Sequence, residues 1–242
     1  MTAQLHLSQF ALPDSPHMPA LPTALRSNTS WSHTDDLRKV WRQLDHDSCP
    51  RHYNFHMHTV CSDGKLPPGD LVSQVLDIGL KGFAITDHHS IKGYARARNL
   101  LPDDGPTLWT GVEITAVLLG VEVHVLGYGF EPQDDVLQTY LTGERVRGID
   151  GEAKTAIAAL HQAGGLAVLA HPFRYRRAAS ELVAAAVEVG IDGIEAYYSY
   201  RNSKPWSPSP VQTEEALELA AAHGLDVTCG TDTHGLNLLQ RI

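Results

Sequence analysis

The stretch Asn54-Phe55-His56-Met57-His58-Thr59-Val60-Cys61-Ser62-Asp63-Gly64 decides which fold and which chemistry this sequence predicts. Two histidines stand two residues apart at the end of a short apolar run, and Asp63 follows five residues later. Residues i and i+2 of a strand point to the same face, so His56 and His58 can converge on one metal ion. Neutral imidazole is the commonest transition-metal ligand. Two histidines alone are weak evidence for a metal site, and further histidines and acidic residues later in the chain strengthen that evidence.

Composition bounds the class of protein. The 242 residues are 43% hydrophobic and 19% charged, which is typical of a soluble globular protein with one large α/β domain or two small ones. No apolar run is long enough to span a bilayer, the N-terminus lacks a secretory signal, and the three cysteines form no disulfide framework. These features predict a cytoplasmic protein without a membrane partner.

The acidic charge balance narrows the partners. A formal net charge of -9 argues against stable binding of long nucleic acid. It leaves room for a nucleotide or a short oligonucleotide end at a metal site, because bound cations dominate the local charge there. A small phosphorylated substrate is therefore expected.

Two regions are predicted along the chain. Residues 1–50 form an N-terminal arm, rich in Pro, Ser and Thr up to about residue 30. One helix follows, with Thr34 as its cap and with an apolar face made of Leu37, Val40, Trp41 and Leu44. Residues 51–242 form the catalytic domain.

Strands and helices alternate in the second region. Strands are predicted up to His58 and over 82–86, 108–114, 121–128, 166–170, 193–197 and 225–229. Helices are predicted over 67–79, 90–100, 134–163 with a break near 148–151, 178–189 and 211–223. Such alternation predicts a parallel sheet with right-handed crossovers, and the number of units favours a barrel.

Polar residues with metal-binding side chains gather at or just beyond the ends of these strands. They are His56, His58, Asp63, His88, Glu113, His124, His171, Asp232 and His234. A β/α barrel places its active site at the carboxyl ends of its strands. Nitrogen and oxygen ligands without cysteine suit Zn²⁺, Mn²⁺ or Fe, and nine of them exceed the needs of one ion. The sequence predicts two or three divalent metal ions.

Five ordered motifs resemble those of the PHP (polymerase and histidinol phosphatase) superfamily. They are His56-Met-His-Thr-Val-Cys-Ser-Asp-Gly, Ile85-Thr-Asp-His-His-Ser, Gly111-Val-Glu-Ile, Ala170-His-Pro and Gly230-Thr-Asp-Thr-His, and the resemblance covers roughly residues 52–235. It implies a distorted (β/α)7 TIM-like barrel, a trinuclear metal site and phosphoester hydrolysis. The full ligand set argues against a metal-free PHP domain.

The resemblance also implies how the ligands divide. One metal would be held by His56, His58, Glu113 and Asp232, and a second by Asp63, His88 and His234. A third would take His124 and His171, with Glu113 bridging two metals. Family members often carry histidine at the position of Asp63, although aspartate in a Ser-Asp-Gly context is also common.

The expected mechanism uses a metal-activated hydroxide that attacks phosphorus in line with the leaving oxygen. Asp232 is the predicted catalytic residue, because it could orient the hydroxide or move its proton. Arg174 is the predicted phosphate-binding residue, since its planar fork matches two phosphate oxygens. Glu195 lies near the predicted site, and its sequence context assigns it no role.

Two other functions stay open at this point. Amidohydrolase-type C–N hydrolases share the two-histidine motif on the first strand, and a count of three metals per chain would favour the phosphoesterase instead. A non-catalytic metal-binding PHP domain is the other alternative. Histidinol phosphate, 3',5'-bisphosphonucleotides and 5'-phosphorylated oligonucleotides are all substrates within the family, and the sequence does not choose among them.

Overall fold

The computed structural model describes residues 30–242, with side chains from residue 34 onward. The arm predicted for residues 1–29 lies outside the described residues. The six α-helices of the described part are α1 (Ser30–Trp41), α2 (Pro68–Ile78), α3 (Lys92–Arg98), α4 (Ala153–Gln162), α5 (Ala179–Glu188) and α6 (Pro210–His223). Short 3-10 helices occur at η1 (Asp135–Tyr140), η2 (Gly148–Gly151) and η3 (Pro172–Arg174).

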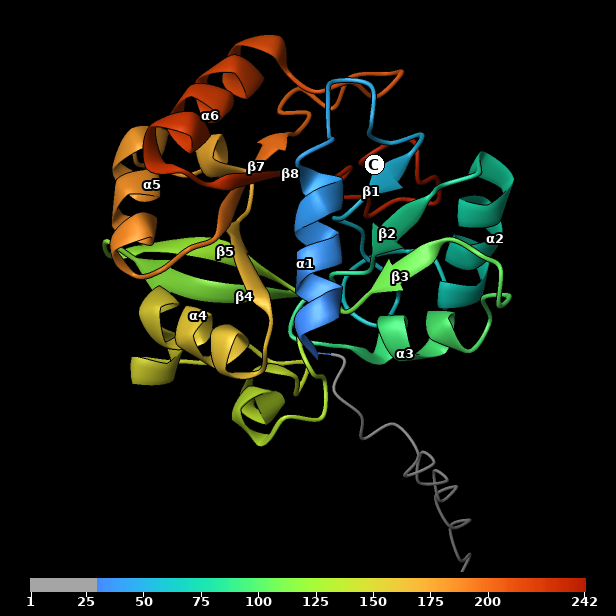
Figure 1. The fold of residues 1–242 in the computed structure, drawn as a ribbon, viewed down its shortest axis with the longest axis horizontal. Helices are drawn as coiled ribbons and strands as arrows, with labels where there is room; N and C mark the ends of the chain where they lie inside the picture. The colour runs from blue at the N-terminus through green and yellow to red at the C-terminus, as the bar shows by residue number, and fades with distance from the viewer. Residues whose placement is uncertain (1–29) are drawn as a thin grey trace, which may run out of the picture.

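The strands form two sheets. Strands β1 (Tyr53–Asn54), β2 (Gly82–Ala84) and β3 (Thr107–Trp109) make a parallel sheet. The second sheet is mixed, in the order β4 (Gly111–Leu118), β5 (Val121–Tyr128), β6 (Leu166–Leu169), β7 (Gly193–Tyr197) and β8 (Asp226–Cys229). In Figure 1, α2 and α3 accompany the first sheet and α4, α5 and α6 the second, while α1 lies between the two groups.

The prediction of an all-parallel sheet is wrong at β5, which runs antiparallel to both β4 and β6. Leu118 pairs with Val121, so only Leu119 and Gly120 connect β4 to β5. Both connecting residues have positive φ, 50° and 72°. A two-residue loop of this kind can join only antiparallel strands, because parallel neighbours need a long crossover.

Backbone contacts link the two sheets beyond the strand ends. The N–H of Phe55 donates to the carbonyl of Cys229 at 3.0 Å, and the N–H of Asp232 donates to the carbonyl of His56 at 2.8 Å. On the other side, the N–H of His89 donates to the carbonyl of Glu113 at 3.0 Å. The segments after β1 and β2 therefore lie against β8 and β4, respectively.

The helix predicted over 134–163 is interrupted at the predicted break near 148–151 and also before it. Only α4 is α-helical there, preceded by η1 and η2. Gly143 and Gly148 adopt positive φ values of 90° and 71°, which end any continuous right-handed helix. The single strand predicted over 108–114 is wrong, because this stretch is divided between β3 and β4, which belong to different sheets. The other predicted strands and helices are confirmed, with boundaries that differ by a few residues.

Helix α1 packs into the main hydrophobic core. The side chains of Leu37 and Trp41 are fully buried there. The Trp41 ring meets Phe55 and Tyr128 edge to face, with centroids 6.2 and 5.4 Å apart. Thr34 lies inside the helix, so its predicted role as the cap is wrong, because the helix already begins at Ser30. The predicted helix of the N-terminal region thus shares a core with the strands.

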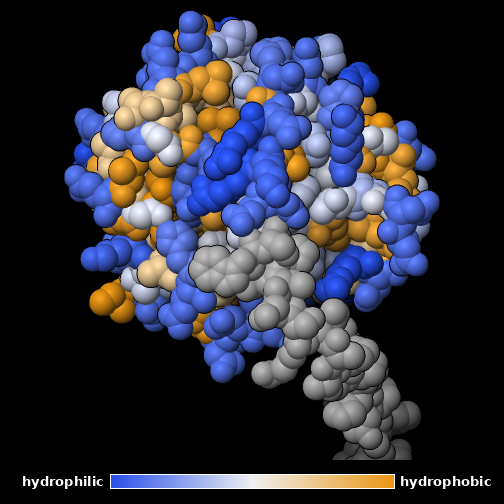
Figure 2. Space-filling model, in the orientation of Figure 1, coloured by the Kyte–Doolittle hydropathy of each residue, from blue (hydrophilic) through white to orange (hydrophobic). Residues whose placement is uncertain are grey.

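The surface is mixed in character. Hydrophilic residues predominate over α1 in the face drawn in Figure 2, and hydrophobic residues form separate patches on either side. Among the described residues, no helix combines the length and the apolar character that crossing a bilayer requires.

Candidate metal centre

Glu113 lies at the middle of the candidate site. Its side chain extends from β4 and is 1% exposed. Its Oε2 is 3.0 Å from Nε2 of His56 and 2.9 Å from Nε2 of His58. Its Oε1 is 2.6 Å from Nδ1 of His124 on β5. One buried carboxylate therefore contacts imidazoles from two separate parts of the fold.

Asp232 approaches the same two histidines from the segment after β8. Its Oδ1 is 3.3 Å from Nε2 of His56 and 3.3 Å from Nε2 of His58. The close approach depends on Gly230, where a Cβ atom would lie 2.2 Å from the Cβ of His56. Asp232 itself has a φ of 53°, an uncommon backbone conformation for a residue other than glycine. Such strain concentrates at functional sites.

A second group lies closer to solvent. Oδ2 of Asp63 is 3.3 Å from Nε2 of His234 and 3.8 Å from Nε2 of His88. The other oxygen of Asp63 is 3.6 Å from Nδ1 of His58. The Asp63 side chain is 55% exposed, whereas His88 and His234 are each 24% exposed.

The structure brings all nine predicted ligands together, and it groups them slightly differently from the predicted division. Three groups could each hold a metal ion: His56, His58, Glu113 and Asp232; His58, Asp63, His88 and His234; and His88, Glu113 and His124. The first group matches the prediction. The second adds His58, and the third contains His88 instead of His171. Buried His171 lies nearby, with Nε2 3.5 Å from Oε1 of Glu113.

Buried ring nitrogens without a well-directed hydrogen bond indicate that the donor set fits metal ions. Among the described residues, both nitrogens of His58 and both nitrogens of His171 lack such a bond, although Nε2 of His58 lies only 2.9 Å from Oε2 of Glu113. A buried polar atom without a partner costs about 1–3 kcal/mol. Divalent metals bind neutral imidazole together with carboxylates, so ions at these positions would satisfy the orphan nitrogens.

Burial and crowding shift the pKa values of the cluster. Burial lowers the pKa of His88 to about 4, so this ring is neutral at pH 7. Burial favours the neutral form of His58 as well, but the nearby carboxylates of Asp232 and Glu113 outweigh burial and raise the pKa of His58 to about 9. Burial opposes ionisation of Glu113, yet His56, His124 and His88 hold its pKa well below the usual 4.5. Metal binding would therefore displace protons from histidines.

Glu195 has a clear structural role that the sequence did not reveal. Its fully buried Oε1 is 2.9 Å from Nδ1 of His56, and its Oε2 accepts a hydrogen bond from the N–H of His171 at 3.0 Å. A carboxylate on the far nitrogen orients a ligating imidazole and fixes its tautomer. The feature of the sequence that could have indicated this role is an acidic residue inside the otherwise apolar strand Gly193–Tyr197.

The second oxygen of Asp232 lies in a separate polar network. Oδ2 accepts hydrogen bonds from Nη1 of Arg174 at 3.0 Å and from the hydroxyl of Tyr198 at 2.7 Å. It also accepts one from Nε of Arg241 at 2.8 Å. Arg174, the predicted phosphate-binding residue, thus lies at the site with its side chain 40% exposed. Arg241 and Tyr198 were not identified as site residues from the sequence.

Asp87 positions the loop that carries Asp63. One of its oxygens accepts hydrogen bonds from the N–H of Thr59 and the hydroxyl of Ser62, both at 2.7 Å. The other accepts from the Thr59 hydroxyl at 2.7 Å. These contacts fix the loop between His58 and Asp63.

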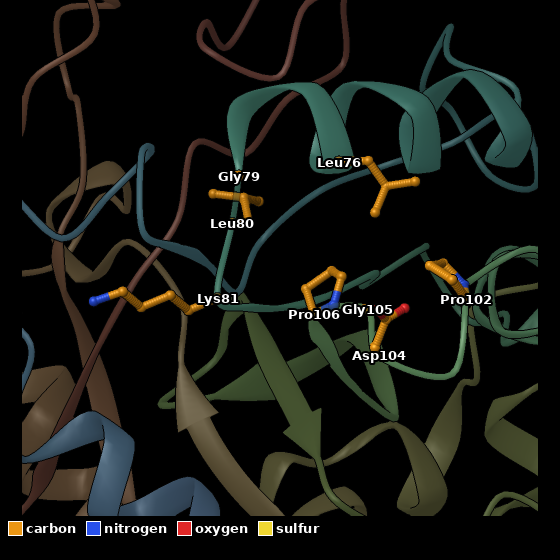
Figure 3. Close-up of a pocket in the computed structure, with 8 residues that line it drawn as sticks. All are labelled: Leu76, Gly79, Leu80, Lys81, Pro102, Asp104, Gly105 and Pro106. Carbon is orange, nitrogen blue, oxygen red and sulfur yellow. The ribbon is translucent and has the colours of Figure 1, made fainter.

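A separate cavity of about 410 Å³ lies between α2 and the loop 102–106. Figure 3 shows Leu76 pointing from α2 toward Pro106 and Asp104, while Lys81 points away. None of the predicted metal ligands lines it. This cavity is distinct from the cluster around Glu113.

Known proteins share both the sequence pattern and the fold. The chain is 25% identical over 190 residues to a 5'-3' exoribonuclease from Haemophilus influenzae, covering 51% of this chain and 69% of that protein. It is 28% identical over 111 residues to a 3',5'-nucleoside bisphosphate phosphatase from Chromobacterium violaceum, covering 46% of this chain and 39% of the relative. The chain thus spans well under half of that second protein.

A solved structure from Bifidobacterium adolescentis, assigned as a metal-dependent phosphoesterase, superposes with a TM-score of 0.64 at 25% identity. The superposition covers 77% of this chain and 88% of the other. The family model of the PHP domain matches residues 54–203, which is more than half of the sequence. The matched segment contains seven of the nine clustered side chains, and with it the chain belongs to the PHP domain family.

Proposed function

We propose that this protein is a metal-dependent phosphoesterase that uses a trinuclear site. The observation that carries the proposal is the cluster around Glu113, where buried ring nitrogens of His58 and His171 lie close to carboxylate oxygens without a well-directed hydrogen bond among the described residues. Family membership and the phosphoesterase relatives support the same chemistry. Zn²⁺, Mn²⁺ or Fe would suit the nitrogen and oxygen donors.

The nine clustered residues are the proposed metal ligands. His56, His58, Glu113 and Asp232 would hold one ion, and Asp63, His88 and His234 a second, with His58 at their border. His124 would hold the third together with Glu113, and His171 lies within reach of the same carboxylate. Ions bound there would lower the pKa of a water and offset charge on phosphoryl oxygens.

Residues of the chain would handle the substrate beside this cluster. Arg174 is the proposed phosphate-binding residue, because part of its guanidinium remains exposed while Nη1 is held by Asp232. Asp232 is the proposed catalytic residue, since its Oδ1 faces the ligands of the first ion. A carboxylate in that position can orient a nucleophile or accept its proton.

The proposed substrate is a small phosphorylated metabolite, a nucleotide or a short oligonucleotide end. The relatives that act on RNA and on nucleoside bisphosphates support the last two. Aromatic rings lie beside Arg174, with Tyr198 and Tyr200 4.8 Å apart and Phe173 and Tyr200 5.5 Å apart. Rings of this kind can stack on a base. The charge of -9 disfavours long nucleic acid.

The wider architecture proposed is a distorted (β/α)7 barrel over residues 51–242, in a cytoplasmic protein. Hydrogen bonds from Phe55 to Cys229 and from His89 to Glu113 support closure of the barrel. They join the segments after β1 and β2 to β8 and β4, which are the two edge strands of the second sheet. The antiparallel β5 would make the barrel irregular.

Phosphate release tests the proposed activity. Purified protein loaded with Mn²⁺ or Zn²⁺ should release phosphate from a panel of nucleoside 3',5'-bisphosphates, 5'-phosphorylated oligoribonucleotides and sugar phosphates. Chelator-treated protein should be inactive and should recover on metal addition. A folded, metal-loaded sample that hydrolyses no phosphoester contradicts the proposal, and hydrolysis of amides instead would favour the amidohydrolase alternative.

A further inference from the structure

The last residues of the chain fold back onto the segment that follows β8. The N–H of His234 donates to the carbonyl of Arg241 at 2.7 Å, and the hydroxyl of Thr233 donates to the carbonyl of Gln240 at 2.7 Å. Leu238 is fully buried in the smaller hydrophobic cluster and anchors this turn. Figure 1 draws the C-terminus beside β1. The backbone of residue 241 is therefore fixed next to two proposed ligands.

The Arg241 side chain points at one of them. Its Nε donates to Oδ2 of Asp232 at 2.8 Å, and the Arg241 side chain is 16% exposed. Oδ1 of the same carboxylate lies 3.3 Å from His56 and His58. The guanidinium thus holds one oxygen of Asp232 while the other oxygen faces the proposed ligand cluster.

We propose that Arg241 is a positioning residue of the metal centre, which fixes the Asp232 carboxylate in the orientation that presents Oδ1 to a metal ion. The inference rests on the proposed function, because it assumes that Asp232 is a ligand. Asp232 stands at a strained φ of 53°, so its side chain direction depends on outside contacts. A charged hydrogen bond of good length provides such a contact.

Arg174 and Arg241 differ in a way that separates their roles. Both donate to Oδ2 of Asp232, at 3.0 and 2.8 Å. The Arg174 side chain is 40% exposed, whereas that of Arg241 is 16% exposed. Arg174 therefore has donors free to meet a substrate, and Arg241 acts on the carboxylate instead.

Mn²⁺ affinity of the full-length protein tests the inference without any substrate. We expect Arg241→Ala to weaken Mn²⁺ binding by about 10- to 100-fold, the range found when partners of metal ligands are removed. Arg241→Lys should recover part of the loss, because lysine keeps the charge and one donor. The matched control is Arg42→Ala, which removes an exposed arginine just after α1 and should leave binding unchanged.

Kinetics and melting separate positioning from other roles. With an active substrate from the phosphoester panel, Arg241→Ala should lower kcat with little change in KM. Unchanged Mn²⁺ affinity with a raised KM would overturn the inference, because Arg241 would then bind substrate. Unchanged affinity with only a lower melting temperature of the metal-free protein would also overturn it.

A second variant at residue 241 covers the case in which the alanine variant is unstable. If Arg241→Ala does not fold, Arg241→Met decides, because methionine keeps an aliphatic stem but has no donor and no charge; wild-type Mn²⁺ affinity together with wild-type kcat in that variant overturns the inference. Because Mn²⁺ binding needs no substrate, failure of the phosphoester panel and failure of this positioning role give different results.

Discussion

Opposite ends of the same strands carry two clusters of charged side chains that are built differently. The carboxyl-end cluster contains the nine proposed ligands, although two of them lie within strands instead of beyond their ends, Glu113 near the start of β4 and His124 in the middle of the antiparallel β5. The amino-end cluster consists of Arg38, His161, Asp192 and Asp226, at the starts of β7 and β8. Both clusters combine histidines with acidic residues, so residue types alone do not distinguish them.

In the amino-end cluster, the acidic side chains have cationic or hydrogen-bonding partners. Arg38 on α1 forms ion pairs with both Asp192, at 2.6 Å, and Asp226. The second oxygen of Asp192 contacts Nε2 of His161 at 2.7 Å and accepts the N–H of Ala167 at 2.8 Å. Each of these oxygens faces a donor, so the cluster is complete without an ion and ties α1 to the strands.

The carboxyl-end cluster is incomplete by the same criterion. Four buried ring nitrogens, on His58 and His171, lie near carboxylate oxygens but form no well-directed hydrogen bond with the described residues. Several imidazoles converge on Glu113, and no arginine or lysine among the described residues pairs with it. The comparison teaches that unsatisfied donors and acceptors, more than the presence of charge, mark a place for metal ions. Satisfied ion pairs mark a place for stability.

The largest expected effect is on the carboxyl-end cluster. Glu113→Gln should lower phosphoesterase activity by more than about 100-fold, because even partners of ligands cost about 10- to 100-fold and Glu113 contacts several proposed ligands directly. Metal-free protein should still fold, since glutamine has nearly the same volume. Activity and Mn²⁺ stoichiometry measure the effect, with Glu215→Gln on the exposed face of α6 as control. Retained Mn²⁺ binding in the variant would contradict the proposed centre.

The next effect concerns the stability of the amino-end cluster. Arg38→Ala leaves two carboxylates without their cation, and their side chains are only 15% and 12% exposed. Breaking a fully buried pair costs about 3–5 kcal/mol, and we expect about 2 kcal/mol here because Arg38 is partly solvated. The melting temperature should fall by about 4–8 °C.

The neighbouring residue provides the control for this change. Lys39→Ala removes an exposed lysine, and its solvated pair with Asp36 should contribute little to stability. Calorimetry of both variants, together with Mn²⁺ affinity, makes the comparison. If Arg38→Ala and Lys39→Ala have the same melting temperature, the amino-end cluster does not stabilise the fold as inferred. If Arg38→Ala weakens Mn²⁺ binding, the amino-end cluster is not independent of the metal centre.

The smallest expected effect is a pH dependence. The hydrogen bond to Asp192 raises the pKa of His161 above 6.5, although burial partly opposes it. Burial opposes ionisation of Asp192, but His161 and the N–H of Ala167 hold its pKa below 3.8. The contribution from His161 is full below pH 6.5 and disappears as pH rises through its folded-state pKa. The contribution from Asp192 is full above pH 3.8 and disappears on further acidification.

The pair should therefore stabilise most between about pH 4 and 6.5. His161→Gln should cost less than 1 kcal/mol at pH 5.5, because the histidine is 38% exposed, and less still at pH 9. Urea unfolding of metal-free protein at both pH values measures this difference, with exposed His223→Gln as control. A larger cost at pH 9 than at pH 5.5 would contradict the assigned pairing.

Local patterns predicted a large part of the fold. The helix over Pro68–Ile78 and the strand Gly193–Tyr197 follow from apolar spacing and from turn residues within a few positions. The antiparallel β5 was missed, although the two-residue connection at Leu119 and Gly120 was present in the sequence. The break near 148–151 was predicted, whereas the earlier interruption depends on the backbone at Gly143, which spacing does not reveal.

The sequence by itself determined which side chains meet at the carboxyl ends of the strands. The spacing of His56 and His58 and the strand-end positions of His171 and Asp232 are local properties, and parallel strands bring their carboxyl ends to one side. The choice of proposed ligands therefore follows from motifs a few residues long.

Only the tertiary structure decided how those side chains are held and what lies at the other end. The contact of Glu195 with His56 joins residues 139 positions apart, and that of Arg38 with Asp226 joins residues 188 apart. Arg241 reaches Asp232 because buried Leu238 folds the chain end back. Packing of the whole core sets these contacts, since no periodicity or short motif relates positions so distant in the chain.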